Sequence, residues 1–131
     1  MMSLAAATSV ILTAGPAMAA AEPGYAGGGR VKPGAELTVK YSGETGAAKS
    51  VTLECDPPGG SHPKAAQACA VLAAAGGNPF TIKPAHSACF LIYAPVTAKV
   101  GGRWRGWQVD WTFTYGNSCE MKRALGVIVA F

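Results

Sequence analysis

The chain has 131 residues, which suffices for one domain and is too few for two of ordinary size. Half of the residues are apolar and only 14% are charged, so the composition excludes a disordered, charge-rich tail. The net charge is +4, and because the lysines and arginines are scattered, they indicate a soluble surface first of all. Many apolar residues are Ala or Gly, so we expect the core to depend on a few bulky side chains, among them Trp104, Trp107, Trp111, Phe113 and Tyr115.

The first residues predict a secretory signal peptide over residues 1–21. Residues 4–14 form an apolar stretch, and the small residues Ala17 and Ala19 flank Met18 as at a signal cleavage site. The stretch is too short to span a bilayer core of about 30 Å. We therefore expect a secreted, extracellular protein with no membrane segment after signal removal. No Lys or Arg precedes the stretch, which favours an upstream start, and an N-terminal anchor is the alternative.

Two strands are predicted after a Gly- and Pro-rich arm. We expect the flexible arm over residues 22–36 and the folded domain over residues 37–131. Residues 36–42 alternate apolar and polar side chains, which is typical of a half-buried strand. Residues 50–55 alternate in the same way and end at a cysteine, so they predict the second strand.

An alanine-rich stretch over residues 64–77 predicts a helix. Pro63 suits its first turn, alanine is the best helix former, and two glycines at the end stop it. Cys69, Leu72 and Ala73 would then lie on one face, where Cys69 could be joined to the preceding strand.

A β-hairpin is predicted around the Gly101-Gly102 pair. Residues 96–100 and 107–115 both alternate apolar and polar side chains, and a two-residue glycine connection suits a tight turn. In this register Val96 faces Trp107, and Ala94 faces Val109.

The C-terminal residues predict a short helix and a last strand. Asn117 could cap the helix, with Glu120 as its capping-box partner, and Gly126 would end it. Residues 127–131 would form the strand. About five short strands and two helices in this order predict an α+β domain, in which helices pack against an antiparallel sheet.

The four cysteines are Cys55, Cys69, Cys89 and Cys119, and in an exported protein we expect them to form disulfides. Three pairings are open, of which the nearest-neighbour pairing closes two local loops and would add roughly 3–4 kcal/mol of stability per bridge.

A zinc site is disfavoured, because no two cysteines are spaced as C-x2-C. The two histidines, His62 and His86, also lie at no ligand spacing. We expect no metal and no cofactor.

The stretch SACFLIYAPV, residues 87–96, has the least ordinary pattern. Its four large apolar residues, 90–93, would bury both faces of a core strand, whereas a small antiparallel sheet offers cover on one face. Pro84 and Pro95 bracket them, and prolines fit badly inside a central strand. A core strand stays the alternative. A stiff, extended segment that inserts into a protein cleft fits the pattern better.

Several stretches resemble the Streptomyces subtilisin inhibitor family of secreted serine-protease inhibitors. They are SVTLEC, GSHPKAAQACAVLAAAGG, CFLIYAPVTAKVGGRWRG, GNSCEM and the closing VAF, and the four cysteines keep the family's order with nearly the same spacings. The likeness covers residues 50–131 and, more loosely, residues 37–49. It implies a five-stranded antiparallel sheet with two helices on one face, the disulfides Cys55–Cys69 and Cys89–Cys119, and a homodimer formed through the sheet.

The resemblance also implies a reactive loop whose scissile bond joins Leu91 and Ile92. The loop residues are Cys89, Phe90, Leu91, Ile92, Tyr93, Ala94 and Pro95. Leu91 would fill the primary specificity pocket of an extracellular subtilisin-like protease, or of a chymotrypsin-like one. The family usually has Pro at the position of Phe90 and often an acidic residue at that of Ala94. Losing the proline removes a φ constraint, which should soften the loop.

Asn117 lies two residues before Cys119, so it should lie close to the loop if Cys119 pairs with Cys89. We expect its side-chain amide to support the loop main chain. A plain helix cap is the alternative.

Other functions are less well supported. Lys99, Arg103 and Arg105 among tryptophans are similar to a nucleic-acid platform, but export separates the protein from nucleic acid. His86 and Ser87 are adjacent, and neighbouring side chains of an extended segment point apart, so we expect no enzyme. An inhibitor of a secreted metalloprotease that acts through another surface, and a secreted binding protein without inhibitory activity, stay as alternatives.

Overall fold

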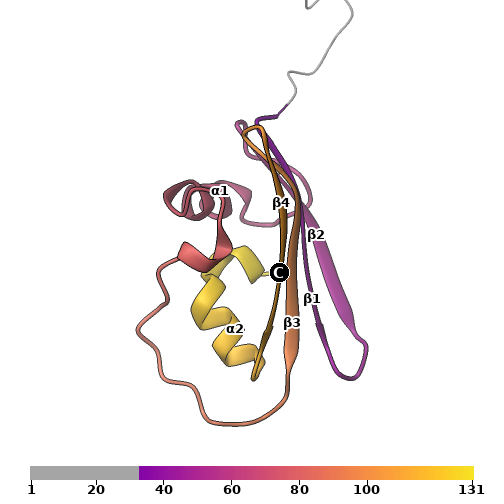
Figure 1. Ribbon diagram of the computed structural model, residues 1–131, viewed down its shortest axis with the longest axis vertical. Helices are drawn as coiled ribbons and strands as arrows, with labels where there is room; N and C mark the ends of the chain where they lie inside the picture. The colour runs from indigo at the N-terminus through magenta and orange to yellow at the C-terminus, as the bar shows by residue number, and fades with distance from the viewer. Residues whose placement is uncertain (1–32) are drawn as a thin grey trace, which may run out of the picture. The chain divides into compact units, whose positions relative to one another are not determined.

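The computed structural model describes residues 33–131. The predicted signal peptide and residues 22–32 of the predicted arm lie outside the described residues. The described chain forms four strands, two α-helices and two short 3₁₀ helices (Figure 1). In chain order they are β1 (Ala35–Gly43), β2 (Ala48–Cys55), α1 (Ala65–Ala74), η1 (Pro79–Thr81), β3 (Val96–Trp104), β4 (Trp107–Tyr115), α2 (Ser118–Leu125) and η2 (Gly126–Val129).

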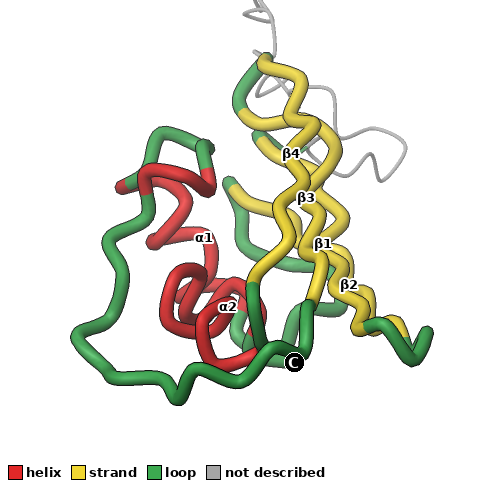
Figure 2. The backbone as a smooth tube through the Cα atoms, turned by 60° about the horizontal axis from the view of Figure 1, so that its bottom comes forward, coloured by secondary structure: helices red, strands yellow, loops and turns green. Residues whose placement is uncertain are grey.

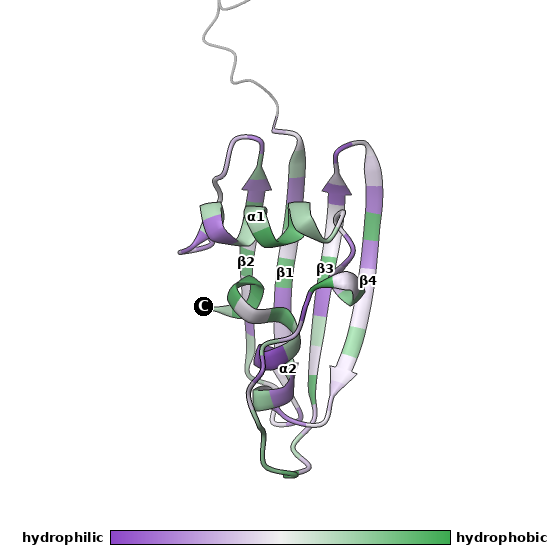
Figure 3. Cartoon of the chain, turned by 90° about the vertical axis from the view of Figure 1, so that its left-hand side faces the viewer, coloured by the Kyte–Doolittle hydropathy of each residue, from purple (hydrophilic) through white to green (hydrophobic). Residues whose placement is uncertain are grey.

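The four strands form one antiparallel sheet in the order β2-β1-β3-β4. Both α-helices cover the same face of this sheet, and the other face carries no helix in the described chain (Figures 1 and 3). The expected α+β class, the antiparallel sheet and the two helices on one face are therefore confirmed. None of the helices in residues 33–131 is long and apolar enough to cross a membrane.

The expected fifth strand is wrong. Residues 126–129 form η2 instead, and this turn buries Ile128 and Val129 in the core. The buried His62 ring holds it there, since Nε2 of His62 lies 3.0 Å from the Ile128 carbonyl oxygen. A compact turn places successive apolar side chains in the core, whereas a strand would have directed every second one to the opposite face.

The expected hairpin register is also wrong. Strand β3 continues through Gly101 and Gly102, so that Val96 faces Tyr115 and not Trp107, and Ala94 lies outside the strand. A contact distant in sequence explains the glycines: Gly102 has a φ of +136°, and a Cβ there would overlap the Glu36 carbonyl of β1. The glycine pair thus allows β1 and β3 to approach rather than turning the chain.

The actual β3–β4 turn lies at Arg105 and Gly106, whose φ values of 44° and 87° suit a tight two-residue hairpin. Arg105 is held in this unusual conformation by its contacts. Its backbone N–H donates to the Gly34 carbonyl over 2.7 Å, and its Nε donates to the Asp56 carboxylate over 2.8 Å. The same hydrogen bond lowers the pKa of Asp56 below its ordinary value.

The core lies between the sheet and the helices, and its largest fully buried side chains include Leu53, Leu72, Met121, Leu125 and Ile128. Helix α1 is confirmed, although Ala73 of its expected inner face is exposed and Ala68 is buried in its stead.

The tryptophans only partly meet the expectation for the core. Trp104 and Trp111 are buried, but Trp107 is 74% exposed and Phe113 is 41% exposed. Both exposed residues lie on β4, the edge strand, where inner-face side chains have neighbours on one side only.

Candidate functional site

The most exposed apolar side chains of the described chain lie in the loop between η1 and β3. Leu91 is 96% exposed, Phe90 is 87% exposed, and Ile92 and Tyr93 are also exposed. The loop runs past α2 and reaches beyond the end of the sheet, where its tip is coloured as strongly hydrophobic in Figure 3 (see also Figure 2). A core strand over these residues is therefore wrong. Four adjacent large apolar residues in solvent indicate a contact surface for another molecule.

Both disulfides join nearest neighbours in sequence. The Cys55–Cys69 bridge is buried and ties the end of β2 to α1, with 5.6 Å between the Cα atoms. The Cys89–Cys119 bridge ties the loop to the second residue of α2, with 5.8 Å between the Cα atoms, and its Cys119 side is exposed. The second bridge therefore anchors the loop two residues before Leu91.

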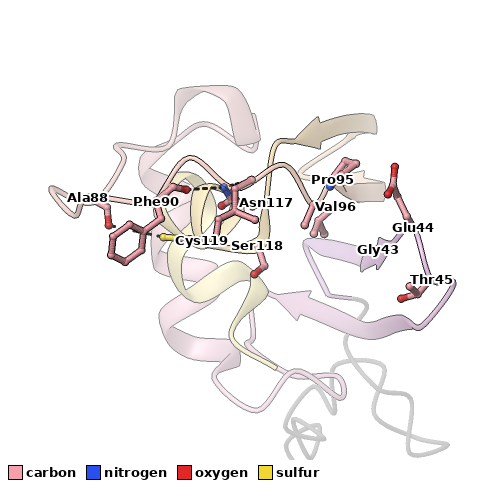
Figure 4. A pocket seen from close by; sticks show the side chains of 12 residues that line it. Gly43, Glu44, Thr45, Ala88, Phe90, Pro95, Val96, Asn117, Ser118 and Cys119 are labelled. Carbon is pink, nitrogen blue, oxygen red and sulfur yellow. Dashed lines mark hydrogen bonds between the residues drawn. The ribbon is translucent and has the colours of Figure 1, made fainter.

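Asn117 contacts both the helix and the loop. Its side chain is buried, and its Oδ1 accepts a hydrogen bond from the Glu120 N–H over 2.9 Å, so it caps α2 as expected. Its Nδ2 donates to the Phe90 carbonyl over 3.2 Å (Figure 4) and to the Ile92 carbonyl over 2.9 Å. The helix cap and the loop contact, considered as alternatives, occur together.

The backbone around Leu91 forms a tight turn. The Ile92 N–H donates to the Phe90 carbonyl over 2.9 Å, which closes a three-residue turn with Leu91 at its centre. Two residues later the Ala94 N–H donates to the Gly116 carbonyl over 2.8 Å, and β3 begins at Val96. The Leu91–Ile92 peptide bond is thus held on both sides, while the Leu91 side chain points into solvent.

An open hollow of about 620 Å³ lies beneath the loop. Phe90, Ile92 and Pro95 line it from the loop, Asn117 lines it from the start of α2, and Glu44 lines it from the β1–β2 turn (Figure 4). Glu44 is the only acidic residue among the lining residues. The loop therefore arches over the domain and is held mainly at its anchoring points.

The titratable side chains at the loop include Tyr93 in the loop itself, Glu44 in the lining of the hollow and Arg123 on α2. Burial raises the pKa of Tyr115, which ends β4 just before Gly116. Within residues 33–131 no group of three or more His, Cys, Asp or Glu is placed to hold a metal ion. The contacts that the structure shows at the loop are hydrogen bonds from Asn117, Arg123 and the main chain, together with the Cys89–Cys119 bridge.

The structure brings the sequence-predicted loop residues, Asn117 and the Cys89–Cys119 bridge together. Sequence reasoning missed Gly116 and Arg123, whose main chain or side chain also contacts the loop. A correct hairpin register would have revealed Gly116, because pairing Val96 with Tyr115 places Gly116 beside the end of the loop.

Comparison with known proteins agrees with this geometry. A family model described as Subtilisin inhibitor-like matches residues 34–117. A putative serine protease inhibitor of Streptomyces avermitilis is 41% identical over 128 residues, which cover 95% of this chain and 81% of that protein. A transglutaminase-activating metalloprotease inhibitor of Streptomyces mobaraensis is 39% identical over 89 residues, which cover 66% of this chain and 60% of that protein.

Among solved structures, that of Streptomyces caespitosus sermetstatin in complex with Bacillus licheniformis subtilisin is similar, with a TM-score of 0.62 and 28% sequence identity. The match covers 74% of this chain and 98% of sermetstatin. The chain therefore belongs to the subtilisin inhibitor-like family, a family of protease inhibitors and not of enzymes.

Proposed function

We propose that the protein is a secreted inhibitor of subtilisin-like serine proteases and that residues 89–95 form its reactive loop. One observation carries the proposal: Leu91 is almost fully exposed, while a single buried amide, that of Asn117, holds the carbonyls on either side of it. The sermetstatin–subtilisin complex, whose inhibitor has the same fold, supports a subtilisin-like partner.

In this proposal the loop docks as a substrate does. The main chain on the N-terminal side of Leu91 would pair with the enzyme as an added strand, and Leu91, at the centre of the turn, would enter the primary specificity pocket. The Leu91 carbonyl would then lie in the oxyanion hole, facing the catalytic serine. Interfaces of such complexes bury about 1,600 Å² with an apolar anchor near the centre, a role that Leu91 and its apolar neighbours suit.

The anchors explain why cleavage of Leu91–Ile92 would not release the inhibitor. The new C-terminus stays attached through Cys89, and the new N-terminus stays attached through Ala94 and β3. Asn117 holds both ends close together, so religation competes with release. Because the loop is already ordered by these contacts, docking loses little further conformational entropy.

The Asn117 contacts also bear on the missing proline at position 90. A proline would fix φ covalently, whereas here the hydrogen bonds to the Phe90 carbonyl from Asn117 and Ile92 restrict the same stretch. Hydrogen bonds can break, whereas the proline ring restricts φ permanently. We therefore propose that this loop is still held in place, but that its resistance to cleavage depends more on Asn117 than it would with proline at position 90.

A second candidate function has one specific observation in its favour. The Streptomyces mobaraensis relative is named as the inhibitor of a metalloprotease. An inhibitor of a secreted metalloprotease would use another surface, and this activity is compatible with a serine-protease loop on the same molecule.

We also propose, from the resemblance, that the protein forms a homodimer through its sheet.

Protease assays test the proposal directly. The mature protein should inhibit subtilisin, with or without chymotrypsin, and should leave trypsin active, because leucine gives the carboxylate in the trypsin pocket no partner. Leu91→Lys supplies that partner and should shift inhibition toward trypsin. Tyr93→Lys is the matched control, since it adds the same charge two residues away and should not inhibit trypsin.

Two outcomes would count against the serine-protease reading. One is unchanged subtilisin inhibition by Leu91→Lys with no gain against trypsin, which would mean that Leu91 is not the anchor. The other is inhibition of a secreted zinc metalloprotease alone, equally strong in both variants, which would place the active surface elsewhere.

A further inference from the structure

The N-terminal limb of the loop, residues 83–88, has no helix or strand and is exposed throughout. Two hydrogen bonds join it to one residue of α2. The Ala85 N–H donates to the Arg123 carbonyl over 2.9 Å, and Nη1 of Arg123 donates to the Ser87 carbonyl over 3.4 Å. Arg123 thus contacts the limb with both its main chain and its side chain.

The end of α2 leaves the Arg123 carbonyl free for this contact. The last four carbonyls of a helix have no partner inside the helix. Gly126, with a φ of +56°, ends α2, and its N–H donates to the Lys122 carbonyl. If the helix continued, the N–H of Val127 would take the Arg123 carbonyl. Because it stops at Gly126, the loop can use this acceptor.

The spacing of the anchors on α2 matches the spacing of their partners in the loop. Arg123 lies four residues after Cys119, so the two lie on the same helix face about 6 Å apart along the axis. Their partners Ser87 and Cys89 lie two residues apart, which spans about 6.6 Å in an extended chain. The limb can therefore follow α2 without distorting either element.

We propose that Arg123 is a positioning residue for the reactive loop, which it fixes at a second point beside the Cys89–Cys119 bridge. The inference rests on the proposed inhibitory function. The Cys89–Cys119 bridge and the main-chain hydrogen bond from Ala85 hold the two ends of the limb, and the residues between them are left free to shift. The Arg123 side chain removes that freedom at Ser87, so the Leu91 end stays near the Ile92 amine after cleavage and religation is favoured over release.

The chain supplies a matched pair of variants for the test. Arg123→Met keeps the apolar stem and removes the guanidinium. Lys122→Met removes the same charge from the neighbouring residue, which lines, together with Arg123, a second hollow between α2 and the limb but makes no hydrogen bond to the limb in the described structure. We expect Arg123→Met to raise the rate of Leu91–Ile92 cleavage by subtilisin about threefold, because the hydrogen bond that it removes is solvent-exposed and, at 3.4 Å, weaker than a short charge-assisted one. Lys122→Met should stay within about twofold, and Arg123→Lys, which keeps the charge on a single nitrogen but loses the planar guanidinium, should lie between.

Hydrogen exchange of the backbone amides of Ala85 and Ile92, which donate to the carbonyls of Arg123 and Phe90, gives a second readout without protease. Exchange should be faster in Arg123→Met than in the wild type and unchanged in Lys122→Met, with similar melting temperatures for both variants. Equal effects of the two substitutions would overturn the proposal, because the lost charge alone would then explain them. The proposal would also be overturned if neither substitution had an effect. If the wild type fails to inhibit subtilisin, the proposed function is lost, yet the exchange comparison still decides whether Arg123 holds the limb.

Discussion

Asn117 uses every polar atom of its side chain, and in two directions. Its oxygen caps α2, and its nitrogen contacts the carbonyls of Phe90 and Ile92. The sequence predicted both the cap and a contact with the loop, because the position before a helix and the proximity to Cys119 are local signals. It could not predict that one side chain makes both contacts, since that depends on the orientation of a buried amide.

Replacing Asn117 by Asp separates the two contacts. Aspartate caps helices as well as asparagine does, but its second carboxylate oxygen would face two carbonyl oxygens in a buried position, so the melting temperature should fall although the cap is kept. Its carboxylate cannot donate to the Phe90 and Ile92 carbonyls, so subtilisin should cleave Leu91–Ile92 faster, by roughly tenfold or more for two lost hydrogen bonds. Asn117→Ala loses both contacts and should show faster cleavage together with about 1 kcal/mol lower stability.

Mass spectrometry of the cleaved chain and thermal unfolding measure these two effects separately. An Asp variant that resists cleavage like the wild type would remove Asn117 from the mechanism and leave it as a helix cap alone.

At the scale of elements, the sequence predicted the strands and helices whose residue pattern is contained within the element itself. Strands β1 and β2, helix α1 and helix α2 follow from apolar alternation, alanine content and capping residues. The β3–β4 register was missed because Gly101-Gly102 looks like a turn, whereas it serves the approach of β3 to Glu36 of β1, a contact distant in sequence. For the same reason the sequence could not place η2, whose position depends on the buried His62 ring.

The two disulfides allow the effect of a lost bridge on stability to be distinguished from its effect on inhibition. Removing either bridge with paired Cys→Ala substitutions should lower the free energy of unfolding by roughly 3–4 kcal/mol. Only the loss of Cys89–Cys119 removes the covalent link between the loop and α2, so only that variant should be cleaved rapidly at Leu91–Ile92 and lose inhibition with time. The Cys55–Cys69 variant, assayed below its melting temperature, is the control for lost stability. Similar loss of inhibition in both variants would mean that general loosening, and not loop anchoring, controls cleavage.

At the scale of the whole molecule, the sheet face away from the helices remains to be accounted for. Its central positions are polar, and Lys40 of β1 lies directly opposite Lys99 of β3, with both side chains exposed. Ser50 and Thr112 flank this pair on the neighbouring strands. The face therefore lacks the apolar centre of a typical permanent interface, and it carries two like charges at its middle.

This face makes a specific prediction for the proposed homodimer. A two-fold contact through the sheet brings the same patch of both subunits together, so the lysine pair of one subunit would approach that of its partner. Salt screens such repulsion between exposed charges, so the dimer should tighten as the salt concentration rises. Lys99→Thr should lower the dissociation constant about two- to fivefold at low salt, and Lys64→Thr, at the start of α1 on the helix side, should leave it unchanged. Sedimentation equilibrium at low and high salt measures both effects. A dimer that weakens with salt, or that responds equally to both substitutions, would show that the subunits do not meet through this face.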